Sequence, residues 1–214
     1  MRFEKHCWAE IDLDALAANY RHIRRHAGGP VCGVIKADGY GHGALAVADT
    51  LRAAGCAAFA VSCLSEARQL RDHGIAGPIL ILGYTDPAFA DELAALDITQ
   101  TLFSAEYGAA LSAAASAANC TVACHLKADT GMGRIGFALR TDFEASVREM
   151  EACFLLPGIR VSGIFQHFAA ADSTRPEDIA YTQNQHALFV RAVDRLRADG
   201  FDPGVTHCAN SAAQ

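Results

Sequence analysis

The sequence lacks the features that mark exported and membrane proteins. Its first residues hold no apolar segment like the centre of a secretory signal. Nowhere do about 18 apolar residues follow one another, which argues against a membrane span. The eight cysteines form no C-x-x-C pair, and their irregular spacing in Ala- and Val-rich segments is typical of buried thiols. We therefore expect a cytoplasmic protein without a bound metal ion.

Charge is also scarce, and it is not basic. Only 20% of the residues are charged, and 18 Lys and Arg face 24 Asp and Glu, for a net charge of −6. This is the wrong sign for binding nucleic acid. With 51% hydrophobic residues, the 214-residue chain is neither disordered nor collagen-like. We expect a single domain over residues 1–214, with no nucleic-acid or membrane partner.

Short apolar runs alternate with helical periods along the chain. The runs predict seven β-strands, at 31–36, 57–62, 79–82, 99–103, 121–127, 161–167 and 204–208. Between them, amphipathic patterns predict helices, with Asp12 as the N-cap of the first and Gly200 ending the last. A further extended segment is predicted at 8–11, without an identified partner.

Strands that alternate with helices predict a parallel α/β fold, for which two architectures compete. A doubly wound sheet is complete with seven strands, but no G-x-G-x-x-G follows the first strand. A (β/α)8 TIM-type barrel needs eight strands and about 250 residues. We favour the barrel, truncated before its eighth strand. Its two open strand edges predict poor stability or association.

Functional residues of such barrels stand at the carboxyl ends of the strands. The first predicted strand ends at Lys36, where desolvation would lower the pKa of the amine and make it a nucleophile. A glycine-rich loop follows, which allows close approach of a ligand but lacks the P-loop pattern. The alternative, which composition alone favours, is a lysine whose stem crosses apolar surface to reach solvent and is followed by an ordinary loop.

Three further strand ends carry polar groups. Arg134 lies in a glycine-dense loop, where it would donate to an anionic oxygen or form a weak surface pair with Asp129. His167 ends the sixth predicted strand, and Ser211 follows the seventh, near where barrels often bind phosphate. Each signal is modest alone. With Lys36 and Tyr40, these residues suit a pyridoxal phosphate site.

Four segments resemble the signatures of alanine racemases. The cofactor-lysine motif is matched by Val-Ile-Lys-Ala-Asp-Gly-Tyr-Gly-His-Gly at 34–43, and the second signature by Asp-Thr-Gly-Met-Gly-Arg-Ile-Gly at 129–136. Gly-Ile-Phe-Gln-His-Phe-Ala at 163–169 resembles the third, and Asn-Ser-Ala-Ala at 210–213 the start of a fourth. The resemblance covers the chain in order and implies pyridoxal-phosphate-dependent interconversion of L- and D-alanine.

Two other activities stay open. Segments 81–85 and 99–102 also resemble the racemase domain of vancomycin-resistance serine racemases, which implies a serine or broad-specificity racemase as an alternative. Single-barrel pyridoxal phosphate carriers without catalytic activity share this fold. Their motifs differ from the run at 34–43, which counts against that interpretation.

The resemblance assigns most of the cofactor site. Lys36 would hold pyridoxal phosphate covalently and act as one of the two acid–base groups, while Tyr40 and Ser211 would contact the phosphate. Asp38 and His42 match the motif as supporting residues.

The remaining assigned residues would surround the cofactor ring. Arg134 would donate to its phenolic oxygen, positioned by Lys127, which matches a lysine carbamylated in some members. His167 and Asn210 would form part of the wall around the ring.

The resemblance also implies parts that lie outside the 214 residues. The second base of the family is a tyrosine in a C-terminal β domain, and it reaches the active site of the neighbouring subunit. The arginine that faces the pyridine nitrogen follows the eighth strand. We therefore expect impaired activity from this chain alone. The resemblance further implies a homodimer that supplies D-alanine for peptidoglycan.

Overall fold

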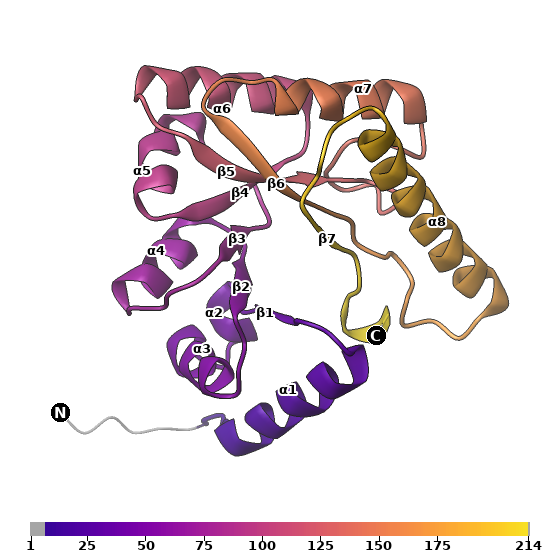
Figure 1. The fold of residues 1–214 in the computed structure, drawn as a ribbon. Helices are drawn as coiled ribbons and strands as arrows, with labels where there is room; N and C mark the ends of the chain where they lie inside the picture. Colours follow the sequence, from indigo (N-terminus) through magenta and orange to yellow (C-terminus); the bar gives the residue numbers. More distant parts are fainter. Residues whose placement is uncertain (1–6, 214) are drawn as a thin grey trace.

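Each of the seven predicted strands is present, and all pair in parallel. The computed structural model describes residues 7–213. One sheet runs in the order β1-β2-β3-β4-β5-β6-β7. The strands are β1 (Cys32–Val34), β2 (Ala58–Val61), β3 (Ile79–Ile81), β4 (Ile98–Leu102), β5 (Val122–Lys127), β6 (Ile159–Phe165) and β7 (Val205–His207). In Figure 1 the sheet curls into an incomplete barrel with the helices around its outside.

Helices connect the strands, as the apolar periods predict, except that α2 is a short left-handed turn in the glycine-rich loop after the first strand. They are α1 (Leu13–Ala27), α2 (Lys36–Tyr40), α3 (Ala44–Ala53), α4 (Leu64–Asp72), α5 (Ala90–Ala95), α6 (Ala105–Ala117), α7 (Phe143–Phe154) and α8 (Pro176–Ala198), with short 3-10 turns η1 (Pro87–Phe89) and η2 (Ser211–Ala213). None of them, within residues 7–213, is both long and apolar enough to cross a membrane.

Both predicted helix ends are confirmed. The Asp12 carboxylate accepts the Ala15 N–H at 2.9 Å, which caps the first turn of α1. Gly200, at φ +90°, lies just beyond α8, in a backbone conformation that suits glycine. The extended segment expected at 8–11 pairs with no strand in the described part of the chain.

Two strands end two residues earlier than predicted, and both ends carry candidate site residues. Lys36 was expected to close the first strand, but β1 ends at Val34 and Lys36 begins a turn. β6 runs two residues earlier than expected, so that His167 lies in the loop after it. Apolar runs do not reveal these ends, because buried residues at the rim continue the run beyond the last residue that pairs with the neighbouring strand.

The alternation of side chains along the strands divides the interior into two parts. The larger core lies between sheet and helices and includes Phe59, Leu126 and Ile164. A small cluster of Ala60, Leu80 and Phe165 forms a second group. The inward side is not wholly apolar, since β5 also places a histidine and a lysine there, as described below.

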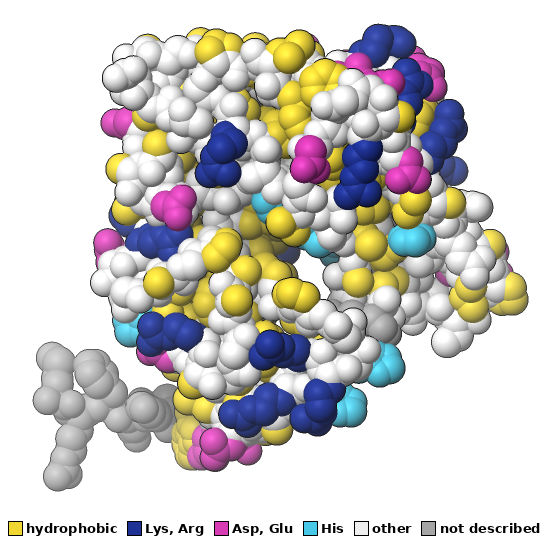
Figure 2. Space-filling view, in the orientation of Figure 1, with side chains coloured by type: hydrophobic (Ala, Val, Ile, Leu, Met, Phe, Trp, Pro, Cys, Tyr) yellow, Lys and Arg dark blue, Asp and Glu magenta, His cyan; other side chains and the backbone are white. Residues whose placement is uncertain are grey.

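The barrel is not closed. In residues 7–213, β1 pairs only with β2 and β7 only with β6. Figure 2 shows an opening in the middle of one face, with hydrophobic and histidine side chains near it. A parallel barrel wall of seven strands is therefore confirmed within the described residues.

Candidate active site

The candidate lysine begins an unusual turn at the carboxyl end of β1. Ala37, Asp38 and Tyr40 have φ values of 52°, 52° and 57°, a left-handed conformation that residues other than glycine adopt at a cost. Asp38 Oδ1 accepts the Ala44 N–H at 2.7 Å, and His42 Nδ1 lies 3.0 Å from the Gly39 carbonyl oxygen. These contacts fix the loop that carries Lys36.

Lys36 and Tyr40 remain accessible to a ligand. The Lys36 side chain is half-buried, and its Nζ lies 5.9 Å from the centre of the Tyr40 ring. Tyr40 is 59% exposed, so its hydroxyl faces open space rather than the core. The turn therefore presents an amine and a phenol side by side at the rim.

Lys127 is the last residue of β5 and is buried. Its Nζ donates to the Ala128 carbonyl at 3.0 Å and lies 5.4 Å from the centre of the Phe165 ring. Burial lowers the pKa of this amine to about 8; Asp129 opposes the shift and Arg134 adds to it. A substantial fraction of the amine is thus neutral at slightly alkaline pH.

Arg134 lies on the loop after β5 with its side chain exposed. The loop is shaped by Asp129, whose carboxylate accepts backbone N–H groups of Gly131, Gly133 and Arg134 at 2.9, 3.0 and 3.1 Å. No ion pair joins the Asp129 and Arg134 side chains within the described residues, so the simple surface pair considered above does not form. The guanidinium is left available to a ligand.

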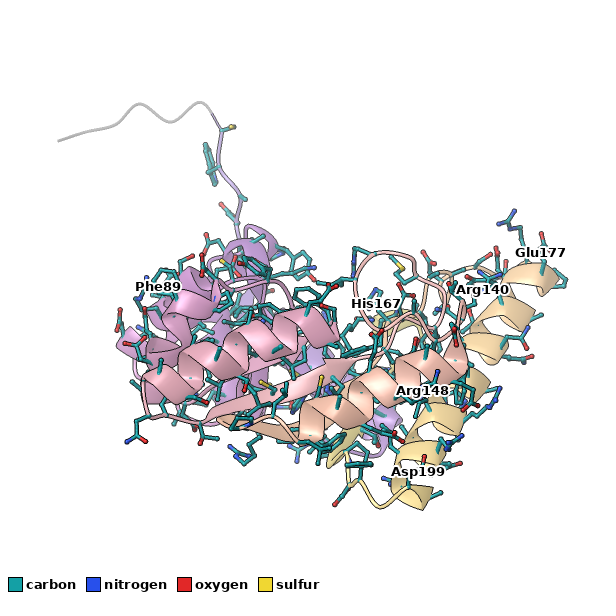
Figure 3. All side chains as sticks on the ribbon, turned by 90° about the horizontal axis from the view of Figure 1, so that it is seen from above. Phe89, Arg140, Arg148, His167, Glu177 and Asp199 are labelled. Carbon is teal, nitrogen blue, oxygen red and sulfur yellow. The ribbon has the colours of Figure 1, made fainter. Side chains whose placement is uncertain are left out.

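The charges around His167 indicate which candidate residues lie close to one another. Burial lowers the pKa of its imidazole, and the positive charges of Arg134, Lys127 and Lys36 lower it further. These four residues come from three strand ends and share one electropositive rim. In Figure 3, His167, Arg140 and Glu177 lie toward one end of the barrel and Asp199 toward the other, because α8 runs antiparallel to the strands.

Asn210 and Ser211 stand apart from this group. They follow β7 at the same end of the sheet, and Asn210 Oδ1 accepts the N–H groups of Ala212 and Ala213 at 3.2 and 3.1 Å. Ser211 is exposed. Within residues 7–213, no hydrogen bond joins either residue to the other candidates.

The structure adds buried polar residues that sequence reasoning missed. Thr130 donates to Gln166 Oε1 at 2.7 Å, and Gln185 of α8 donates to Thr130 Oγ1 at 3.2 Å. Gln185 Oε1 also accepts the Ala169 N–H at 3.0 Å, which ties the loops after β5 and β6 to α8. A signal was present: Gln185 interrupts the apolar face of a helix, where a buried amide needs partners.

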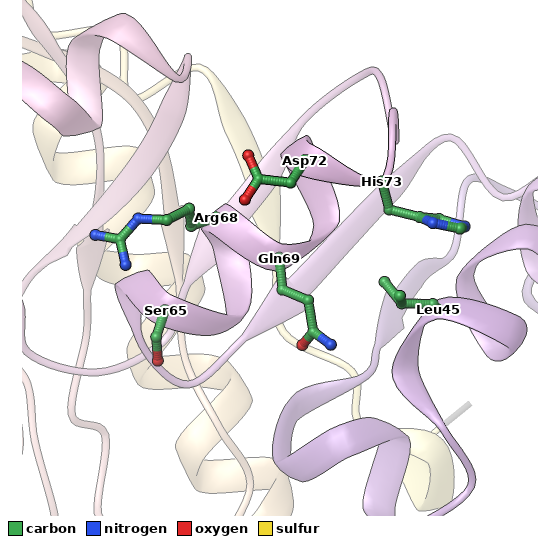
Figure 4. Close-up of a pocket in the computed structure, with 6 residues that line it drawn as sticks. All are labelled: Leu45, Ser65, Arg68, Gln69, Asp72 and His73. Atoms are coloured by element: carbon green, nitrogen blue, oxygen red, sulfur yellow. The ribbon is translucent and has the colours of Figure 1, made fainter.

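A hollow of about 400 Å³ lies away from this rim, between α3 and α4. Figure 4 shows its lining residues, Leu45, Ser65, Arg68, Gln69, Asp72 and His73. Arg68 pairs with Glu92 and His73 with Asp49, so charged groups at this hollow are already engaged in surface contacts. It does not share the candidate residues.

The fold and the rim together define an α/β barrel protein whose candidate ligand site combines a lysine-bearing turn with nearby cations. The family model described as alanine racemase, N-terminal domain, matches residues 11–214. The chain belongs to this family.

Individual relatives agree with the assignment. The chain is 42% identical over 207 residues to the alanine racemase of Clostridium novyi (strain NT), covering 96% of this chain and 52% of that protein. It is 45% identical over 213 residues to the alanine racemase of Desulfovibrio desulfuricans, covering 99% and 56%. Its structure resembles alanine racemase from Clostridium difficile 630 with a TM-score of 0.90 and 36% identity, covering 99% and 57%. The chain thus spans about half the length of these relatives.

Proposed function

We propose that residues 1–214 form the pyridoxal-phosphate-binding barrel portion of a racemase that interconverts L- and D-alanine. The names of the relatives support the reaction, and the rim supports the cofactor. The observation that carries the proposal is the convergence of Lys36, Lys127 and Arg134 on His167. Three cations around a neutral imidazole suit a cofactor with phosphate and phenolate oxygens.

The residues present fit this group. Lys36 Nζ would hold it covalently, because the amine stands half-buried at the rim rather than in an ion pair with a carboxylate in the described chain. The exposed Tyr40 hydroxyl and Ser211 would contact the phosphate, and Arg134 would donate to the phenolic oxygen. Lys127 would help to position Arg134, while His167 and Asn210 would line the ring. Bound pyridoxal phosphate supplies the electron sink that makes the α-proton of an amino acid removable.

Lys36 would then move the proton on one face of the substrate. Its Nζ would accept the α-proton or return one to the same carbon, and racemisation needs a second group on the opposite face. Tyr40 is assigned to the phosphate, and no other tyrosine of this chain matches the second base by motif. We therefore propose that the 214-residue chain alone racemises alanine slowly.

Reconstitution with pyridoxal phosphate tests the cofactor assignment. The chain has only three lysines, Lys5, Lys36 and Lys127, so borohydride reduction followed by peptide mass analysis identifies the attached one. We expect the absorbance of a lysine-bound cofactor and a single adduct at Lys36, both lost in Lys36→Ala. An adduct spread over the other lysines, or none at all, would overturn the proposal.

The substrate is tested by following exchange of the α-proton for deuterium with L-alanine and L-serine as alternatives. We expect slow, Lys36-dependent exchange with L-alanine as the better substrate. If exchange is faster with L-serine, serine rather than alanine is the substrate. Cofactor binding without any exchange would indicate a carrier.

We further propose a cytoplasmic role in supplying D-alanine for peptidoglycan, carried out by a homodimer. The absence of any disulfide among the cysteines at positions 7 to 208 is compatible with a reducing compartment. Sedimentation of the protein with its cofactor tests the dimer, for which a mass of twice the chain is expected.

A further inference from the structure

One carboxylate joins the ends of two strands beside the candidate lysine. Glu66 lies in the first turn of α4, and its Oε1 accepts the Ala37 N–H at 2.8 Å. Its Oε2 accepts both the backbone N–H of Ser62 at 2.7 Å and the Ser62 hydroxyl at 2.8 Å. Ala37 directly follows Lys36, and 29 residues separate it from Glu66.

Helix capping explains only half of this arrangement. A glutamate in the third position of a helix commonly reaches back to a backbone N–H before the helix, as Oε2 does with Ser62. The contact of Oε1 with Ala37 serves no cap, because Ala37 belongs to another loop. It holds the residue after Lys36 in place.

The held residue is the first in the left-handed turn. Ala37 has φ 52° and ψ 52°, and a residue with a Cβ adopts this left-handed conformation at a cost, so such a turn persists only where its surroundings fix it. Asp38 fixes the far end through the Ala44 N–H at 2.7 Å. Glu66 fixes the end that bears Lys36.

The charge of the carboxylate fits the same role. Partial burial of Glu66 opposes ionisation, but hydrogen bonds from Ser62 and Ala37 and the charge of Lys36 together hold the pKa of Glu66 below its ordinary value. The group is therefore an anion at neutral pH and close enough to Lys36 to be influenced by its charge. A charged acceptor forms stronger bonds than a neutral one.

We propose that Glu66 is a positioning residue for Lys36: by holding the Ala37 N–H, it fixes the strained turn that aims the Lys36 amine into the rim. This inference rests on the proposed function, in which Lys36 binds the cofactor. Glu66 itself touches neither cofactor nor substrate in this role.

Glu66→Gln separates the two halves of the contact. A glutamine has one acceptor oxygen and one NH₂ group, so it cannot accept from both Ala37 and Ser62. We expect pyridoxal phosphate to bind to Lys36 about tenfold more weakly, which corresponds to one hydrogen bond to a charged acceptor. The readouts are titration of the cofactor absorbance and the fraction of Lys36 fixed by borohydride. Hydrogen exchange of the Ala37 amide should accelerate in the same variant.

Two control variants show whether the effect is specific. Ser62→Ala removes the hydroxyl on the capping side and keeps the Ala37 contact, and Glu106→Gln removes an exposed first-turn carboxylate of α6. Both should bind the cofactor as the unmodified chain does. If Glu66→Gln fails to fold, Glu66→Asp keeps the charge but is one methylene too short to reach both partners, and the same loss is expected.

The outcomes distinguish this inference from the proposed function. A Lys36 adduct in the unmodified chain that is weakened only by the Glu66 variants, with unchanged thermal unfolding, supports the positioning role. Equal trapping in all variants overturns the positioning role and leaves the cofactor assignment standing. No Lys36 adduct in the unmodified chain overturns the proposed function and this inference with it.

Discussion

At the scale of single residues, Lys127 has the most consequential environment. Its side chain is 3% exposed, and its amine has one hydrogen bond, to the carbonyl of Ala128. Burial lowers its pKa from 10.5 to about 8. Folding therefore favours the neutral amine, and a charged amine at this position costs stability.

Lys127→Met should remove this cost. In the unmodified chain, the Lys127 amine keeps its proton up to about pH 10.5 in the unfolded state but only up to about pH 8 in the folded state. Its stability should therefore rise between pH 8 and 10.5, by about 1.4 kcal/mol per pH unit. The methionine variant should be more stable below pH 8, and this difference should vanish toward pH 10.5. Urea unfolding of both chains across this pH range measures the difference in stability. The same dependence of stability on pH in both chains would contradict the lowered pKa of Lys127.

Residues are predictable from sequence where their partners are near in the chain. Asp12 caps the helix that follows it, and the lysine and arginine motifs are continuous segments. Glu66 and Gln185 act on residues 29 and 55 positions away; a local pattern can mark Gln185 as buried, but it does not identify the partner of either side chain. Their environments become visible only when the strand ends are brought to one rim.

At the scale of elements, β5 and β7 are linked across the strand between them. His125 Nδ1 and His207 Nε2 lie 3.1 Å apart, and the His207 ring stacks on Phe165 with ring centres 5.0 Å apart. A Cβ at Gly163 of β6 would overlap the His125 ring. The glycine thus leaves room for two imidazoles to meet inside the barrel.

This link should break in acid. Burial lowers the pKa of both imidazoles to about 4; His207 adds to the shift at His125, and Lys127 adds to it at His207. Since the unfolded value is 6.5, the contribution to stability is complete above pH 6.5 and is lost as pH falls to 4, by about 1.4 kcal/mol per pH unit for each ring.

His125→Leu tests the link. The loss of stability between pH 6.5 and 5, measured by urea unfolding, should become less steep by about 1.4 kcal/mol per pH unit, because His125 no longer titrates while His207 and His167 still do. His186→Leu, at an exposed position of α8, is the matched control and should keep the original slope. An unchanged slope in the His125 variant would show that the pair does not carry the acid sensitivity.

A second link between elements runs through Gln185. Its amide binds Thr130 Oγ1, the His167 carbonyl and the Ala169 N–H at 3.2, 3.4 and 3.0 Å. Gln185→Leu removes these three hydrogen bonds, although Thr130 keeps its bond to Gln166, and should cost about 1–3 kcal/mol of unfolding free energy. Denaturant unfolding measures the loss, and Gln183→Leu, exposed on the same helix, should change little. Equal effects in both variants would contradict a specific role for Gln185.

At the scale of the whole molecule, the order of strands was predictable because the strands are short, mostly apolar runs and each of the first six is followed by a helix. The break in the barrel followed from counting strands. The shared rim of Lys36, Lys127 and His167 followed from placing them at strand ends. What the sequence does not give is the register that ends β1 at Val34 and β6 at Phe165, because register depends on which residues pair between strands.

The two open edges set the behaviour of the 214-residue chain in solution. Within residues 7–213, β1 and β7 each have one strand neighbour, and the apolar side chains Val34 and Val205 are 40% and 62% exposed on them. Unpaired backbone groups beside apolar side chains favour pairing with another chain. We expect the sedimentation mass of the 214-residue chain to rise with concentration.

Val205→Lys should reduce this association, because a charged side chain on an edge strand opposes pairing. Leu155→Lys, at a 74% exposed position after α7, should leave association unchanged. A single monomeric species at every concentration of the unmodified chain would show that the edges are protected in another way.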